Sequence, residues 1–235
     1  MFWIILSWLM QENYHFFLLV NAGAGRVPLL DALMIFCAND LIFVLPMLLL
    51  VLWGRPGFLR RRALRPGEAE IITACREAFL WSIGAILLAV AFNMGLSHLI
   101  FEPRPFVSHR VHLLVSHPAD DSFPSDHAAV SFAVAGMLLF TVPAQLVSAW
   151  KQRVLFWQTH NWHCLLLPLL VMGLALMIAC CIGIARVFVG VHYPGDIVGG
   201  ALSGMSAAGT IIALRRPLRW PTEAFLHVLA VLHLT

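Results

Sequence analysis

The sequence has 235 residues, of which 60% are hydrophobic and only 11% are charged, and its mean hydropathy is +0.85. A soluble domain carries about 25% charged residues, so this composition excludes one and predicts a polytopic membrane protein. The formal net charge of +3 comes from arginines in short loops, which does not indicate nucleic-acid binding. The five cysteines lie in or beside apolar segments without metal-ligand spacing, so we expect no disulfide and no metal site.

The two ends of the chain are expected to lie at the membrane surface. The first residues lack a basic n-region and a small-residue cleavage site, so a cleaved signal peptide is not expected. Residues 11–28 mix polar and apolar side chains, and segment 1–28 is therefore predicted to be interfacial. The tail at 217–235 is partly apolar but short, and it is placed on the surface as well.

Between these ends, five apolar runs are long enough to cross the roughly 30 Å hydrocarbon core as helices. The predicted fold is therefore all-α: one membrane-embedded domain over 1–235, built as a polytopic bundle of five or six membrane helices. The five runs lie at 29–53, 71–101, 125–146, 165–185 and 194–214.

The arginines predict the orientation of these spans. Segments 54–70, 147–164 and 215–219 carry most of the basic residues, and five spans would place all three on the same side. Because basic loops stay in the cytoplasm, the opposite face is predicted to lie outside. That face holds the unusual residues of the chain, and we expect the active site there.

Three separated segments bring polar side chains to the outer face. They are "SHLIFEPRPF" (97–106), "FPSDH" (123–127) and "ARVFVGVHYPGD" (185–196). Guanidinium groups and a hydroxyl are suited to holding the oxygens of a phosphate. The candidate site residues that these segments share are Arg104, Ser125, His127, Arg186, His192 and Asp196.

Backbone signals point to the same pocket. Pro194 fits the first turn of the last span, and Pro124 precedes a helix that begins near Ser125. Both helices would aim their N-termini at the outer face, where free N–H groups and the positive end of the helix dipole attract anions. The sequence therefore predicts an anion site there.

The histidines add a reaction to this site. Asp196 lies four residues after His192 and can accept a hydrogen bond from one ring nitrogen, which leaves the other as a nucleophile. His127 can protonate the departing oxygen. Taken singly, Ser125 and Asp126 are explained as helix N-caps, and a lone interfacial histidine as a solvated residue. The coincidence of all these groups favours phosphoryl transfer through a phosphohistidine, with arginines neutralising the charge.

These residues resemble the signature of the type-2 phosphatidic acid phosphatase superfamily, KxxxxxxRP, PSGH and SRxxxxxHxxxD. The three parts correspond to Arg104-Pro105, to "PSDH" at 124–127, and to "AR" at 185–186 with His192 and Asp196. The resemblance covers roughly residues 14–214. It implies that His192 is the nucleophile, Asp196 its orienting partner and His127 the general acid, with no metal and no other cofactor. The residues that it implies for binding and cradling the phosphate are Arg104, Arg186, Ser125 and Asp126.

Three positions depart from the family pattern: Ser97 replaces the lysine, Asp126 the glycine and Ala185 the serine. His98 follows Ser97, and if the second span stays helical to about residue 101 its imidazole can replace the missing positive charge. An interfacial histidine that faces lipid headgroups is the other interpretation of His98. Glu102 is expected either to orient Arg104 or to be a solvated loop acid.

The runs "FEPRPFV", "FPSDH" and "GVHYPGD" look like the bacitracin-resistance type of undecaprenyl-diphosphate phosphatase. That group implies a polyprenyl diphosphate substrate and an active site at the outer face of the bacterial inner membrane. A phosphatase of phosphatidylglycerophosphate or phosphatidate and a lipid A phosphotransferase stay open within the enzyme class. A carrier that flips polyprenyl phosphate is an alternative of another class, although a carrier has no use for the His192–Asp196 pair. Lipid chain length and oligomeric state are not predicted.

Overall fold

The computed structural model describes residues 2–58, 68–151 and 163–231, and every regular element in these ranges is a helix. One isolated antiparallel bridge joins Pro103 to Asp121. This architecture agrees with the predicted all-α fold. The elements are α1 (Phe2–Asn21), α2 (Pro28–Asn39), the 3-10 turn η1 (Leu41–Phe43), α3 (Val44–Phe58), α4 (Glu68–Ser97), α5 (Pro105–Ser108), α6 (Asp126–Lys151), α8 (His163–Phe188), α9 (Pro194–Ala213) and α10 (Arg215–Val231).

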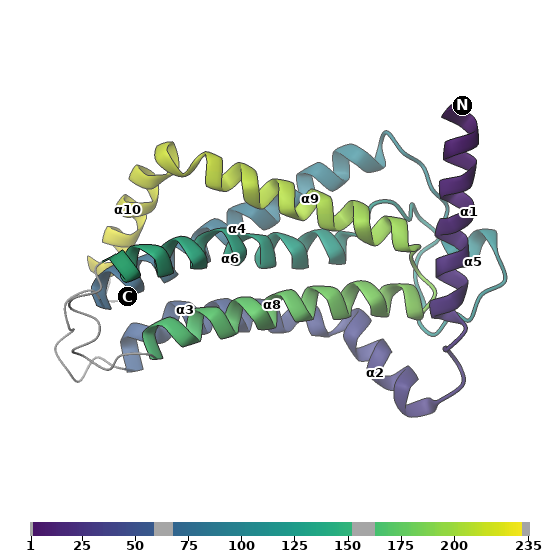
Figure 1. The fold of residues 1–235 in the computed structure, drawn as a ribbon, viewed down its shortest axis with the longest axis horizontal. Coiled ribbons are helices and arrows are strands. Elements are labelled where there is room, and N and C mark those ends of the chain that lie inside the picture. The colour runs from purple at the N-terminus through teal and green to yellow at the C-terminus, as the bar shows by residue number, and fades with distance from the viewer. Residues whose placement is uncertain (1, 59–67, 152–162, 232–235) are drawn as a thin grey trace.

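Helix α6 lies at the centre of the bundle and packs against α4, α8 and α9, all of which run along the long axis in Figure 1. Its contact with α9 is close because Gly200 and Gly204 of α9 face Ala129 and the backbone of α6, where a Cβ atom would collide. Small residues spaced four apart are the usual means by which membrane helices approach each other. This contact places the first turns of α6 and α9 side by side.

Further apolar clusters hold the rest of the bundle. In one, Leu45 and Leu52 of α3 pack with Leu138 of α6 and Ile182 of α8. Another lies at the loop end, the end of the bundle that carries the loops between α4 and α6 and between α8 and α9. There α2 and the last turn of α8 pack around Val189. The bundle is therefore packed through apolar contacts along its length, and the loop end is the part that carries polar groups.

The first predicted span, 29–53, is not one straight helix. It breaks after Asn39 into α2 and α3, which meet at an angle of 49°. At the break the Asp40 carbonyl accepts a bond from Phe43 N, so the chain changes from the α-helical to the 3-10 pattern. Asn and Asp side chains compete with the helix by bonding locally, and their adjacency here is the sequence signal for the bend. The Asp40 side chain is exposed.

Three helices are long and apolar enough to cross a membrane: Cys75–Ser97, Pro168–Phe188 and Pro194–Ala213. The bent pair of α2 with η1 and α3 provides up to a fourth crossing in the described ranges, and the apolar part of α6 described there, Asp126–Val142, is shorter. The chain is thus a multi-pass membrane protein. The count of five or six membrane helices and the single-domain boundary 1–235 remain predictions.

The terminal helices lie at opposite ends of the bundle. Helix α1 crosses the bundle axis at the loop end, whereas α10 turns back at the far end (Figure 1). Asn13 of α1 accepts a 2.7 Å hydrogen bond from Gly195 N, which ties α1 to the start of α9. Thr222 of α10 accepts a 3.2 Å bond from the Trp81 indole of α4. The surface placement of segments 1–28 and 217–235 remains a prediction.

Candidate active site

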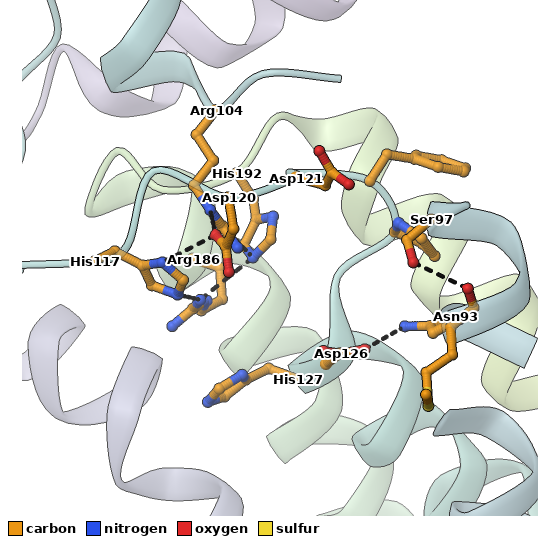
Figure 2. A pocket seen from close by; sticks show the side chains of 13 residues that line it. Asn93, Ser97, Arg104, His117, Asp120, Asp121, Asp126, His127, Arg186 and His192 are labelled. Atoms are coloured by element: carbon orange, nitrogen blue, oxygen red, sulfur yellow. Dashed lines mark hydrogen bonds and ion pairs between the residues drawn. The ribbon is translucent and has the colours of Figure 1, made fainter. Parts of the chain in front are cut away.

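The three polar segments singled out in the sequence meet at one end of the bundle, where α4 and α8 end and α6 and α9 begin. A pocket of about 350 Å³ opens between them (Figure 2). The residues that line it are Asn93, Met94, Ser97, Arg104, His117, Asp120, Asp121, Phe123, Pro124, Asp126, His127, Arg186 and His192.

The His192 imidazole is buried with only 3% exposure. One of its ring nitrogens faces two cations, and the other faces a carboxylate. Nε2 lies 3.2 Å from Arg104 Nη1 and 3.3 Å from Arg186 Nη2, and Nδ1 lies 3.3 Å from Asp196 Oδ2. A guanidinium only donates hydrogen bonds, so we assign the lone pair to Nε2 and the proton to Nδ1. Burial, together with the charges of Arg186 and Arg104, lowers the pKa of His192 well below its usual value and keeps the ring neutral.

The Asp196 carboxylate, which is fully buried, is oriented by the start of α9. Its Oδ2 accepts a 2.8 Å bond from Tyr193 N, the N-cap of that helix, and a second bond from the Ser122 hydroxyl. A carboxylate at the third helical position is a common partner of the N-cap N–H. The first turn of α9 therefore aims Asp196 at His192, as the four-residue spacing predicted.

The Arg104 guanidinium is the first of the two buried cations. Its Nε donates a 2.7 Å bond to Asp120 Oδ1, and its Nη1 donates a 3.0 Å bond to the Val191 carbonyl. Burial alone would raise the pKa of Asp120, but the hydrogen bond and charge of Arg104 outweigh it and lower that pKa. Asp120 thus carries a negative charge that holds Arg104 beside His192.

Arg186 is the second cation, and it meets a histidine of the loop before α6. Its Nη2 lies 3.1 Å from His117 Nε2, while its buried Nε has no hydrogen-bond partner among the described residues. Burial lowers the pKa of His117, and the charges of Arg104 and Arg186 lower it further. A neutral His117 accepts the Arg186 bond at Nε2. Of the three histidines at positions 109, 112 and 117 of this loop, His117 is the one that lines the pocket.

The other wall of the pocket comes from the last turns of α4 and the first turn of α6. Asn93 Nδ2 donates a 2.8 Å bond to Asp126 Oδ1, and Ser97 lies beside them (Figure 2). Helix α4 ends at Ser97 rather than at about residue 101, because Leu99 N and Ile100 N both turn back to the Leu96 carbonyl.

His98 consequently lies beyond the end of α4, where it is exposed and does not line the pocket. The structure therefore does not bring this predicted residue to the site, and Ser97 occupies the position of the family lysine.

Ser125 and His127 have different positions in the site. Ser125 is buried and does not line the pocket; its hydroxyl lies 3.5 Å from Ala128 N, as in an N-cap. His127, which is half-buried, lines the pocket at the start of α6, apart from the cluster around His192 (Figure 2). Phosphate binding by Ser125 and acid catalysis by His127 remain predictions.

Three residues of the network were missed by the sequence interpretation: Asp120, Ser122 and Asn93. The first two lie in the acidic stretch "ADDS" directly before the "FPSDH" motif, which was the available signal. Asn93 gave no sequence signal because it is a single polar residue inside an apolar span.

Within the described ranges, no group of three His, Cys, Asp or Glu side chains is arranged to hold a metal ion.

The arginine–histidine–carboxylate network of this bundle suits the binding of a phosphoryl group, and similarity to known proteins gives the family. Residues 78–220 match the PAP2 superfamily, and the chain belongs to it. This membership confirms the resemblance drawn from the three motifs.

Two relatives are similar over most of their length. The Escherichia coli (strain K12) protein provisionally named undecaprenyl-diphosphatase YbjG is 36% identical over 193 residues, which cover 82% of this chain and 77% of that protein. Undecaprenyl-diphosphatase BcrC of Bacillus subtilis (strain 168) is 28% identical over 187 residues, covering 80% and 76%. The crystal structure of Aquifex aeolicus LpxE aligns with a TM-score of 0.54 at 24% identity and covers 86% of this chain and 95% of that one, which supports the fold.

Proposed function

We propose that this PAP2 lipid phosphatase hydrolyses undecaprenyl diphosphate to undecaprenyl phosphate and inorganic phosphate. The observation that carries the proposal is the state of His192, whose Nε2 lone pair faces two guanidiniums while Nδ1 faces Asp196. A nucleophile held between phosphate-binding cations suits transfer of a phosphoryl group to the ring. The names of the two relatives support the choice of substrate.

In the first step, the His192 Nε2 lone pair attacks the terminal phosphorus, and the bond from that phosphorus to the bridging oxygen breaks. The bridging oxygen leaves as part of undecaprenyl phosphate and takes a proton from His127, which enters this step as the protonated imidazolium. Arg104 and Arg186 move from His192 Nε2 to the phosphoryl oxygens, whose charge they neutralise. Asp196 stabilises the positive ring that forms.

In the second step, a water molecule attacks the phosphorus of phosphohistidine and the P–N bond breaks. His127, now neutral, accepts the proton that the water loses, and inorganic phosphate leaves. The electron pair of the broken bond returns to Nε2, so His192 is again neutral with its proton on Nδ1.

The experiment is a substrate panel with the purified protein in detergent, comparing undecaprenyl diphosphate, farnesyl diphosphate, phosphatidylglycerophosphate and phosphatidate by phosphate release. We expect the highest kcat/KM for undecaprenyl diphosphate. Faster phosphate release from one of the phospholipids would identify that lipid as the substrate instead. Phosphate that appears on added lipid A instead of in solution would indicate a phosphotransferase, and no transfer from any donor would favour a carrier.

We further propose that the protein lies in the bacterial inner membrane with the pocket facing the periplasm or the exterior. The basic residues at 215–219 lie at the end of α9 that is remote from the pocket, which supports this orientation. A reporter fused after Arg216 should be cytoplasmic. A cysteine at the exposed position Leu113 should react with impermeant reagents in intact cells, in a background without other reactive cysteines. The opposite pattern would invert the orientation.

A further inference from the structure

The two carboxylate oxygens of Asp196 are unequally bonded. Oδ2 has three partners, His192 Nδ1, Tyr193 N and the Ser122 hydroxyl. Oδ1 is equally buried, yet no backbone or side-chain N–H or hydroxyl of the residues that the structure describes donates to it. A buried carboxylate oxygen without a donor loses the stabilisation that water would give it, so a further donor is expected at this position.

Glu102 lies near Asp196, and Ser122 contacts both residues. Its carbonyl accepts a 2.7 Å bond from Ser122 N, the residue whose hydroxyl bonds Asp196, and the following residue, Pro103, forms the bridge to Asp121. These contacts bring the half-buried Glu102 carboxyl within hydrogen-bonding reach of the Asp196 carboxyl. A carboxyl group can donate such a bond only when it is protonated.

The surroundings favour the protonated form of Glu102. Burial, followed by the charge of Asp196, raises the pKa of Glu102 to about 7. Tyr193 also lies near; burial and the charge of Glu102 raise the pKa of this phenol to about 12, so it stays neutral. Arg104, two residues along the loop, is bonded to Asp120 instead of Glu102. Orientation of Arg104, one of the two roles expected for Glu102, is therefore provided by Asp120.

We propose that Glu102 is a positioning residue whose protonated carboxyl donates a hydrogen bond to Asp196 Oδ1, which holds Asp196 with its other oxygen toward His192. The bond also favours the ionised form of Asp196, because a charged carboxylate is the stronger acceptor. This role deepens the proposed phosphatase function and rests on it, since it matters only if His192 is the nucleophile.

The role predicts a dependence on pH. As pH rises through about 7, Glu102 loses its proton, the bond to Oδ1 is lost and two carboxylates repel each other. Asp196 then holds His192 less firmly, so kcat should fall while KM changes little. The substrate diphosphate titrates in the same region, which is why the comparison must be made between variants.

The experiment measures kcat and KM for undecaprenyl diphosphate from about pH 5.5 to about pH 8.5 in the wild type, Glu102→Gln and Glu102→Ala. The Gln amide donates at every pH, so Glu102→Gln should keep kcat within about threefold at pH 6 and lose the alkaline decline. Glu102→Ala should lower kcat by about tenfold or more, with KM within about twofold. Glu223→Gln on α10, whose side chain bonds Arg219 at the protein surface, serves as the control and should match the wild type.

A Glu102→Gln enzyme with the wild-type alkaline decline, or a Glu102→Ala enzyme with wild-type kcat, would overturn this role. If Glu102→Ala does not fold, as judged by size-exclusion chromatography, the profile of Glu102→Gln decides alone. A wild type that releases no phosphate from any lipid of the panel would instead contradict the proposed function. The two failures are therefore distinguishable.

Discussion

The two walls of the pocket differ in charge and in the way they are built. One wall, here called the basic wall, carries both buried guanidiniums and comprises Arg104, His117, Arg186 and His192. The other, here called the α4 wall, comprises Asn93, Ser97 and Asp126 and has no cation. A phosphoryl group with several negative charges is therefore favoured only against the basic wall.

The walls also differ in how their side chains are held. Arg104 and Arg186 of the basic wall each bond to residues far along the chain, so their positions depend on several loops at once. In the α4 wall, the hydrogen bond from Asn93 to Asp126 joins the last turns of α4 to the first turn of α6. The difference teaches that the positive charge is concentrated on one side, and that the α4 wall is where new charge can be added at small structural cost.

The largest expected effect comes from removing the nucleophile of the basic wall. His192→Ala should lower phosphate release at least 10³-fold, on the order of what loss of an essential catalytic group costs. Radiolabelled phosphate from the substrate should be trapped on wild type that is denatured at alkaline pH, where the P–N bond is stable, but not on the variant. His117→Ala removes another imidazole of the same wall and should keep activity within about tenfold. Substantial turnover by folded His192→Ala would exclude a phosphohistidine on this residue.

Next in size is the loss of one guanidinium from the basic wall. Arg186→Gln should lower kcat/KM by about 10²–10³-fold, because a positioned donor to the developing charge is lost. The measurement is a kinetic comparison with Arg110→Gln, which removes an exposed arginine outside the pocket. Equal losses in the two variants would mean that net charge, rather than contact with phosphate, is responsible.

A smaller effect should follow from adding a cation to the α4 wall. Ser97→Lys restores the lysine of the family motif at a position that lines the pocket, and it should lower KM by about threefold to tenfold at low salt. His98→Lys places the same charge one residue further on, at an exposed position outside the pocket. An equal decrease in KM in His98→Lys would show that the added charge acts from a distance. A loss of activity in His98→Ala would show that His98 contributes to the site after all.

The smallest expected effect is on stability at acid pH. Burial and the two arginines lower the pKa of His117 in the folded protein, so the unfolded chain binds more protons once pH falls below about 6.5. Stability should therefore decline from pH 7 to pH 5. His117→Gln should reduce this fall in Tm by about 1–3 °C, measured by thermal unfolding in detergent. An unchanged decline in the variant would assign it to other groups, such as His192.

Much of the site was predictable because its chemistry depends on residue types that are rare in membrane spans. Placing charged and imidazole side chains beside apolar helices costs free energy, so such residues indicate a function. The chain has two arginines, two histidines and an aspartate of this kind, and their positions at the ends of the predicted spans placed them at the same membrane face. The partners that hold them were not predictable. Asp120 and Ser122 are ordinary loop residues by sequence, and only folding of the loop onto α9 brings them to Arg104 and Asp196.

The sequence by itself determined the helical membrane class, the helix starts at Pro194 and near Ser125, and the local His192–Asp196 pairing. These features depend on hydrophobicity and on contacts within one turn of a helix, which are short-range. The tertiary structure decided the end of α4 at Ser97, the bond of Ser122 N to the Glu102 carbonyl and the bond of Arg104 to Asp120. These features depend on how distant segments pack. A side chain that can be solvated, bonded or turned away gives no signal until its neighbours are in place.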